Sequence, residues 1–370
     1  MASQTGLANL GATCFLNTGI QCLRHSRLVR EHLGSFNEED LKISIEVNKI
    51  ILFGTPEEKL KISCKRIDNI NLYLAFKKTL KDLQESSTYI APRDLLAFGR
   101  TYSTHVGMEH LFSGQQCDIQ EFITFIIDAI HESKAKHSEM TISPRIIGTM
   151  EEKIMFDGLT MFKKYFGEKY SWVIKHFFYL IIGFIKCVNC NYISFSYDPS
   201  NVLCLPIPKK RADSASCDMN LYDCMDHYFG KEILTDSASW KCDKCANTCG
   251  NFKEYKLLSS PSILIIVIKR FNFNGRWQKN GEVVQFPIIL NIAKYKIGSE
   301  KRDCNYRLFA VANHVGSMGG GHYFAYCCDL ENSEMPWYEF NDERVSRINE
   351  SSIYTPNSYM LFYQLVPDLE

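Results

Sequence analysis

The chain has 370 residues, of which 45% are hydrophobic and 23% are charged, the composition of a globular protein with a sizeable core. Lysine plus arginine and aspartate plus glutamate number 42 each, so the formal net charge is zero. Because no net positive field is present, composition does not favour a nucleic-acid-binding protein or a protein held on an anionic membrane. We therefore expect neither nucleic acid nor a membrane among the partners.

Length and cysteine usage bound the organisation and the compartment. A chain of this length suggests two or three domains, or one large domain with insertions. The sequence holds 15 cysteines, and its first residues, MASQTGLANLG, contain neither a basic segment nor an apolar run. We therefore expect no secretory signal and an intracellular protein of the cytoplasm, the nucleus or both. Its cysteines are then reduced thiols, metal ligands or a nucleophile.

In chain order, the first notable stretch is NLGATCFLN at 9–17, where Cys14 stands among small and turn-forming residues. Apolar residues recur with a helical period over 15–33, which predicts one helix with Thr13 as its N-cap. A helix N-terminus lowers the pKa of a thiol, so Cys14 is a candidate nucleophile. The alternative is a buried structural cysteine, which is the interpretation we accept for Cys22 on the same helix.

The remaining pattern divides the chain into a helical part and a strand-rich part. Helical periods continue to about residue 175, as in QQCDIQEFITFIIDAIHES at 115–133, and strand patterns dominate from about residue 185. The longest apolar run, FFYLIIGFI at 177–185, is about half as long as a bilayer crossing requires, so we predict buried core. The segment 206–218, PIPKKRADSASCD, is the best candidate for a flexible loop.

A thiol nucleophile needs a base, and His322 has the most unusual setting of the ten histidines. It follows three glycines and opens a strand in GGGHYFAY, and glycines allow another backbone to approach an imidazole closely. The stretch WYEFNDERV offers Asn341 and Asp342 to hold the second ring nitrogen. Taken alone, FND is more often a turn, so only the combination of thiol, imidazole and amide indicates catalysis.

Two CxxC pairs, CVNC and CDKC, predict a metal site. The pairs are Cys187 with Cys190 and Cys242 with Cys245, and 51 residues lie between them. Four thiolates satisfy a closed tetrahedral zinc site, so one bound zinc ion would be structural and not catalytic. The alternative is four reduced surface thiols without metal, and Cys249 is close enough in sequence to confuse the assignment.

Several motifs in order make the chain resemble the ubiquitin-specific proteases, the thiol-dependent ubiquitin carboxyl-terminal hydrolases. The motifs are GLANLGATCFLNTGIQ, QCDIQEF, ILIIVIKRF, VVQFPIIL, YRLFAVANHVGSMGGGHYFAYC, WYEFNDERV and SYMLFY. The resemblance implies an α+β, papain-like cysteine protease fold with thumb, palm and fingers subdomains. It implies a single catalytic domain over 6–365, with a helical thumb at about 6–175, zinc-bearing fingers at about 185–260 and a β-rich palm at about 261–365.

Carried over position by position, the resemblance implies the catalytic residues. Cys14 is the nucleophile and His322 the general base. Asn341 orients the base, with Asp342 beside it as a second candidate for that task. Asn9 matches the asparagine that stabilises the oxyanion.

The resemblance also implies the residues that bind the substrate. Asp118 matches an aspartate that contacts the extended ubiquitin tail in relatives, and Gln116 belongs to the same motif. Gly320 and Gly321, with Gly319, are expected to line a narrow channel that a Gly-Gly terminus can enter.

The function implied is hydrolysis of the isopeptide or peptide bond after the C-terminal glycine of ubiquitin, through a thioester. The partners expected are ubiquitin or ubiquitinated proteins, bound by a monomeric chain. Two alternatives remain open: the same hydrolysis on a ubiquitin-like modifier, and a module that binds ubiquitin without cutting it.

Overall fold

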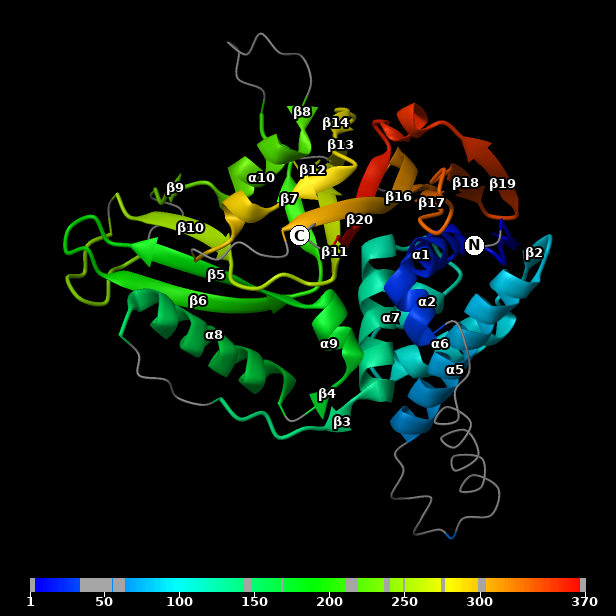
Figure 1. Ribbon diagram of the computed structural model, residues 1–370, viewed down its shortest axis with the longest axis horizontal. Coiled ribbons are helices and arrows are strands. Elements are labelled where there is room, and N and C mark those ends of the chain that lie inside the picture. The colour runs from blue at the N-terminus through cyan, green and yellow to red at the C-terminus, as the bar shows by residue number, and fades with distance from the viewer. Residues whose placement is uncertain are drawn as a thin grey trace. The chain divides into compact units, whose positions relative to one another are not determined.

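The computed structural model falls into two compact units that alternate along the chain (Figure 1). The first unit takes Met1–Ala135, Phe271–Gly281 and Phe309–Phe362, and the second takes the intervening segments and the C-terminal residues. The residues that the structure describes are 4–33, 55, 64–142, 148–167, 169–209, 219–235, 240–248, 250–273, 277–298, 304–317 and 319–366.

Helices dominate the N-terminal part of the first unit. Two of these helices pack through aromatic side chains. The rings of Phe15 in α1 (Cys14–Arg24) and Phe122 in α7 (Ile119–Lys134) meet edge to face with centroids 5.9 Å apart. The short strands β1 (Gly6–Leu7) and β2 (Tyr89–Ile90) pair in parallel beside these helices. The helices are α1 (Cys14–Arg24), α2 (Arg27–Leu33), α5 (Cys64–Glu85), α6 (Arg93–Thr104) and α7 (Ile119–Lys134), with a 3-10 helix at Glu109–Phe112.

The single helix predicted from residue 14 to residue 33 is wrong, because the structure divides it into α1 and α2. The break lies at Ser26. The Ser26 hydroxyl accepts a hydrogen bond from the backbone N–H of Val29 at 3.4 Å, which is the interaction of an N-cap at the start of a second helix. All residues of α1 are buried, whereas α2 buries only Val29 and Leu33.

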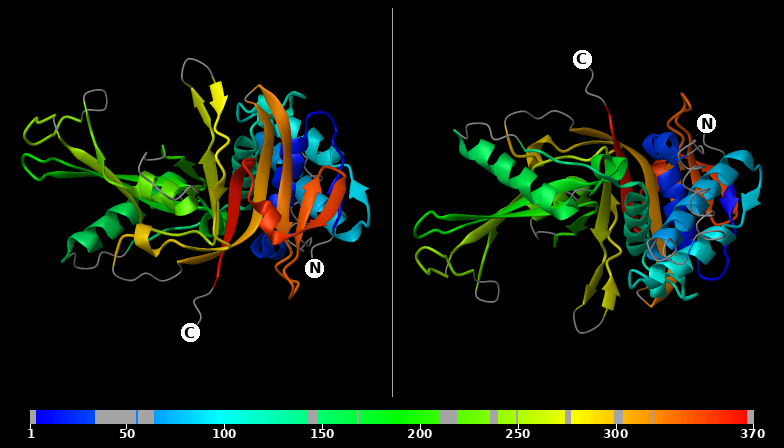
Figure 2. Two further views of the ribbon diagram at one scale, coloured as in Figure 1. Left: turned by 90° about the horizontal axis from the view of Figure 1, so that it is seen from above. Right: turned by 90° about the horizontal axis from the view of Figure 1, so that it is seen from below.

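A sheet from the C-terminal part of the chain packs against α1 in the same unit (Figures 1 and 2). Within this unit its strand order is β19-β18-β17-β16-β20. The antiparallel β16–β17 register pairs Val315 with His322, and α1 contacts β17 directly. The strands are β16 (Asn305–Ser317), β17 (Gly320–Cys328), β18 (Trp337–Asn341), β19 (Arg344–Ile348) and β20 (Ser358–Leu365). The hairpin β12 (Phe271–Phe273) and β13 (Trp277–Lys279) and a 3-10 helix at Glu350–Ile353 complete this unit.

The second unit is built on a sheet with strand order β6-β5-β10-β9. The helix α8 packs on β5 and β6, and Ile154, Leu180, Ile182 and Leu258 form their shared core. The strands are β5 (Tyr179–Lys186), β6 (Ile193–Ser200), β9 (Glu232–Ile233) and β10 (Phe252–Leu257), and the helices are α8 (Met150–Phe166), α9 (Trp172–Phe177) and α10 (Leu221–Phe229). Further strands are β3 (Lys136–His137), β4 (Lys169–Tyr170), β7 (Leu203–Pro206), β8 (Met219–Asn220), β11 (Ile263–Lys269), β14 (Val284–Gln285) and β15 (Ile289–Asn291), with a 3-10 helix at Ala293–Tyr295.

The apolar run at 177–185 forms the end of α9 and most of β5, and it is largely buried as predicted. Within the described ranges, no helix has the length and apolarity needed to span a bilayer. Most of the predicted loop at 206–218, from residue 210 onward, lies outside the described residues. The division into thumb, fingers and palm stays a prediction.

Candidate active site

Cys14 is the first residue of α1, as the sequence predicts. Only 2% of its surface is exposed. Burial raises the pKa of its thiol, and the Asp342 carboxylate raises it further, whereas hydrogen bonds from the backbone N–H groups of Tyr323 and Phe15 lower it. The Tyr323 contact places the sulfur beside the residue that follows His322 in β17.

Thr13 precedes the helix at the N-cap position, but its side chain does not cap α1. Its hydroxyl instead accepts a hydrogen bond from the backbone N–H of Leu10 at 3.0 Å. The hydroxyl therefore shapes the loop that leads to Cys14, and the helix N-terminus keeps its N–H groups directed towards the thiol.

His322 and Asn341 lie on neighbouring strands, β17 and β18, and their side chains meet. The His322 Nε2 atom is 2.7 Å from Asn341 Oδ1. Because an amide oxygen only accepts hydrogen bonds, Nε2 carries the proton and the lone pair is on Nδ1. The sequence-predicted base and its orienting amide are thus brought together in the tautomer that a general base requires.

Asp342 forms a second cluster with two asparagines that precede and follow Cys14 in the sequence. Asp342 lies in the tight turn between β18 and β19 with φ of 50°, so the turn interpretation of FND also holds. Its Oδ2 accepts from Asn9 Nδ2 at 2.9 Å, and its Oδ1 accepts from Asn17 Nδ2 at 2.8 Å. Both carboxylate oxygens therefore hold the segment that carries Cys14.

Asn17 is a site residue that the sequence analysis missed. It follows Cys14 by three positions, so both lie on one face of α1. Its side chain is buried and also donates to the carbonyl oxygens of Leu7 and Ala8 at 3.3 and 3.2 Å. The sequence around Asn17 gives no signal of this role, because its partner Asp342 lies far along the chain.

Asp118 is the N-cap of α7. Its Oδ1 accepts from the backbone N–H of Gln120 at 2.7 Å, and its Oδ2 accepts from the Tyr359 hydroxyl at 2.7 Å. Burial raises the pKa of Asp118, and these two hydrogen bonds oppose the rise. The carboxylate is therefore fixed in place by α7 and β20.

Gln116 reaches from the segment before α7 to the start of β17. Its side-chain Nε2 donates to the carbonyl oxygen of Gly321, and its Oε1 accepts from the Gly321 backbone N–H. Gly320 lies beside the same side chain, since a Cβ atom there would be 3.3 Å from Gln116 Oε1. Three of the residues predicted to bind the substrate are therefore in mutual contact.

His314, on β16, is a second histidine beside the site that the sequence analysis did not single out. Its ring packs on Tyr323 with centroids 4.6 Å apart. A Cβ atom at position 321 would be 2.4 Å from His314 Nε2, so Gly321 has to be glycine. Burial, with smaller effects from the charges of Lys279 and His322, lowers the pKa of His314 to about 4, so this imidazole is neutral at physiological pH.

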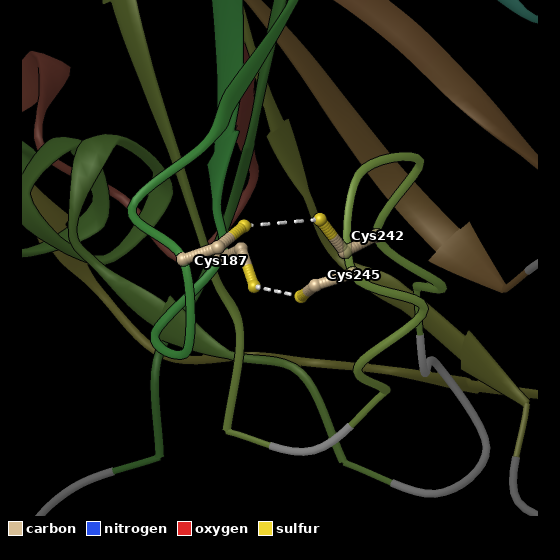
Figure 3. A group of neighbouring side chains, drawn as sticks. Cys187, Cys242 and Cys245 are labelled. Carbon is tan, nitrogen blue, oxygen red and sulfur yellow. Dashed lines mark hydrogen bonds between the residues drawn. The ribbon is translucent and has the colours of Figure 1, made fainter.

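The four predicted metal ligands form one cluster in the second unit (Figure 3). The sulfurs of Cys187 and Cys245 are 3.6 Å apart, as are those of Cys190 and Cys242, and all four lie within 4.8 Å of one another. A tetrahedral ion with metal–sulfur bonds of about 2.3 Å holds its sulfurs about 3.8 Å apart. The cluster therefore fits a metal ion, and Cys249 lies outside the described residues.

Both CxxC pairs adopt the same turn. The backbone N–H of Asn191 donates to the carbonyl oxygen of Cys187 at 3.0 Å, and that of Ala246 donates to Cys242 at 2.8 Å. Asn191 and Ala246 have left-handed backbones, with φ of 56° and 58°. Two matching turns that face each other are the preorganised frame that a four-thiolate site needs.

A buried thiol at a helix start, next to a strand whose histidine is bound by an asparagine, is the arrangement of the papain-like class. The family model described as "Ubiquitin carboxyl-terminal hydrolase" matches residues 5–363. The chain therefore belongs to the ubiquitin carboxyl-terminal hydrolase family.

Curated relatives carry the same family description. The chain is 28% identical to "Ubiquitin carboxyl-terminal hydrolase Usp2" of Drosophila melanogaster, with 97% of this chain and 34% of that protein covered. It is 28% identical to "Ubiquitin carboxyl-terminal hydrolase 2" of Homo sapiens, with 97% and 55% covered. The chain thus spans about a third to a half of these relatives.

The structure is similar to the "SAGA Ubp8/Sgf11/Sus1/Sgf73 DUB module bound to ubiquitin aldehyde" at a TM-score of 0.68 and 24% identity, with 99% of this chain and 71% of that chain covered. A second structure of that module, "bound to monoubiquitin", matches at a TM-score of 0.65 and 23% identity, with 98% and 69% covered. The predicted α+β, papain-like fold is confirmed by these similarities.

Proposed function

We propose that the protein is a cysteine-dependent deubiquitinase that hydrolyses the isopeptide or peptide bond after the C-terminal glycine of ubiquitin. The observation that carries this proposal is the placement of Cys14 beside β17 together with the His322–Asn341 hydrogen bond. Family membership supplies the substrate class, and the relatives' names and the ubiquitin-bound structures support it.

The site geometry gives each residue a step. His322 Nδ1 accepts the Cys14 proton, and Asn341 holds the ring while the imidazolium forms. The thiolate attacks the scissile carbonyl carbon, and the amine leaves with the proton that His322 returns to it. Water, deprotonated by His322, then attacks the thioester, and Cys14 is released as the thiol.

The oxygen that becomes negative in the tetrahedral intermediate needs fixed donors. Asn9 Nδ2 carries two hydrogens, of which one is donated to Asp342, so the other can serve the oxyanion with the backbone N–H of Cys14. Asp342 in this scheme positions Asn9, and Asn17 braces Asp342 from the helix. One oxyanion donor contributes about 2.7–4 kcal/mol to transition-state stabilisation in well-studied hydrolases.

The test is hydrolysis of ubiquitin carrying a C-terminal fluorogenic amide, followed by cleavage of diubiquitin. We expect turnover by the wild type and loss of turnover in Cys14→Ala. Cys64→Ala, which removes an exposed thiol of α5, is the matched control and keeps the activity. A folded wild type that binds ubiquitin but shows no turnover would support the non-cleaving module instead, and parallel assays with ubiquitin-like modifiers separate the other alternative.

We further propose that the four-cysteine cluster binds one structural zinc ion. Sulfur ligands in a closed tetrahedral arrangement suit zinc and leave no position for a substrate. When bound, the ion cross-links the two CxxC turns, and the catalytic steps do not use it. Metal analysis should find about one zinc per chain in the wild type and in Cys64→Ser, but much less in Cys242→Ser. A zinc-free wild type purified without chelators contradicts this assignment.

A further inference from the structure

The contact between Gln116 and Gly321 joins one side chain to both backbone polar groups of a single residue, the N–H and the carbonyl oxygen of Gly321. The Gln116 carboxamide donates to the Gly321 carbonyl oxygen and accepts from the Gly321 N–H. An extended peptide strand uses the same donor and acceptor pair when it pairs with a neighbouring strand. The glutamine side chain thus occupies the donor and the acceptor that a neighbouring peptide strand could use at Gly321.

The position of this contact links it to the chemistry. Gly321 immediately precedes His322, and Gly320 lies against the same glutamine oxygen. Gln116 itself stands two residues before Asp118. The Asp118 carboxylate is held in place by the backbone N–H of Gln120 in α7 and by the Tyr359 hydroxyl. The glutamine therefore bridges the two segments that are expected to flank the tail of the substrate.

The nucleophile Cys14 is also enclosed in the state in which Gln116 contacts Gly321. Cys14 is 2% exposed, although a thiol that attacks a large substrate has to be reached by a carbonyl carbon. Gln116 itself is exposed, whereas Gly320 and Gly321 are half-buried. Water can therefore compete for the Gln116 amide. The two hydrogen bonds between Gln116 and Gly321 can break without unfolding either segment.

We propose that Gln116 is a gate residue, whose side chain closes on Gly321 in the free protein and is displaced by the backbone of the substrate's C-terminal peptide. The identity of that peptide as a Gly-Gly terminus rests on the proposed function. Gln116 thus controls access to Gly321 and does not take part in proton transfer.

The gate predicts how a small reagent reaches Cys14 without any ubiquitin. Chloroacetamide, a small neutral alkylating reagent, is added to the wild type, Gln116→Ala and Gln115→Ala, and modification of the Cys14 peptide is followed by mass spectrometry. We expect Gln116→Ala to react about tenfold faster than the wild type, the factor that one net hydrogen bond controls. Gln115→Ala, which removes the adjacent exposed glutamine, should react at the wild-type rate.

A second variant keeps the size of the gate but removes its donor. Gln116→Glu cannot donate to the Gly321 carbonyl oxygen, so we expect it to react faster than the wild type as well. Rates are compared at several pH values around the pKa of the thiol, which separates access from ionisation. Equal Cys14 rates in the wild type, Gln116→Ala and Gln116→Glu overturn the gate. Because the assay needs no ubiquitin, the gate and the proposed deubiquitinase activity can fail independently.

Discussion

The hydrogen bond between His322 and Asn341 sets the tautomer of the base, so its loss should affect catalysis and leave substrate binding intact. We expect Asn341→Ala to lower kcat for a fluorogenic ubiquitin substrate about 10- to 100-fold, a large part of the contribution of a positioned base, with little change in KM. Asn341→Asp retains an oxygen acceptor and should recover most of the rate. An alanine variant with wild-type kcat would show that the ring is oriented in another way.

His314 makes stability depend on pH in a defined direction. Its pKa is lowered to about 4 from an ordinary 6.5. As the pH falls, the His314 side chain is therefore protonated at a higher pH in the unfolded chain than in the folded chain. The neutral ring therefore stabilises the fold above pH 6.5, and this stability is lost as the pH falls towards 4. After screening by solvent, we expect a loss of about 1–2 kcal/mol in unfolding free energy between about pH 7 and about pH 5.

Urea unfolding of the wild type and His314→Gln at both pH values measures this effect. Other groups titrate in the same range, so the quantity of interest is the difference between the two proteins. The difference should shrink as the pH is lowered, because the glutamine does not titrate. A difference that stays constant or grows contradicts a buried neutral imidazole.

The sequence made some site residues visible and concealed others. Cys14 and His322 stand out because their neighbours are unusual for a packed core. Asn17 acts through a contact with Asp342, more than 300 positions away. His314 acts through contacts with the adjacent strand β17. Such contacts leave no local signal, because a polar residue on a helix or strand looks the same whether it braces a site or faces water.

At the scale of elements, the contact between α1 and α7 fixes the thiol relative to the segment that carries Gln116 and Asp118. Gly19 lies at this contact, and a Cβ atom there would be 2.8 Å from Phe122 Cδ1. Alanine normally stabilises a helix interior by about 1 kcal/mol relative to glycine. Overpacking at this contact costs about 1–3 kcal/mol, so the clash should prevail.

We therefore expect Gly19→Ala to lower the unfolding free energy by about 1 kcal/mol despite the better helix propensity of alanine. Gly281→Ala is the matched control, because nothing lies within 4 Å of its Cβ position, and it should change stability by less than about 0.5 kcal/mol. Chemical denaturation of both variants makes the comparison. A Gly19→Ala protein more stable than the wild type would mean that the two helices are not in close contact.

Element boundaries were the weaker part of the sequence reading. The apolar period over residues 15–33 is loose, and the Ser26 hydroxyl accepts a hydrogen bond at the break between α1 and α2. A serine inside a helical period is compatible with either outcome. The strands fared better, since continuous apolar runs such as that of β11 are too short for a buried helix and too long for a loop.

At the scale of the whole molecule, each of the two units is built from segments that are not consecutive along the chain. The first unit needs Phe309–Phe362 as well as Met1–Ala135, and α1 packs on β17. Length alone suggested two or three domains or one large one, but no composition change marks this interleaving, because it is a property of the strand order. Only the resemblance to a known family indicated that the distant motifs around Cys14 and His322 belong to one site.

This interleaving predicts that the helical segment does not fold alone. A fragment of residues 1–135 lacks β17, so the apolar face of α1 would be exposed to water. We expect it to show no cooperative unfolding transition, in contrast to the full chain. Circular dichroism during urea titration measures this. A sigmoidal transition for the fragment would mean that the C-terminal strands are dispensable for its fold.

The most direct test of the central claim is labelling with ubiquitin that carries a C-terminal propargylamide, a probe that reacts with a thiol placed at the scissile bond. The adduct should form on the wild type and on Cys64→Ala, map by peptide mass spectrometry to Cys14, and form much more slowly in His322→Ala. An adduct on another cysteine, or unchanged labelling of Cys14→Ala, would contradict the assignment of Cys14 as the nucleophile that His322 activates.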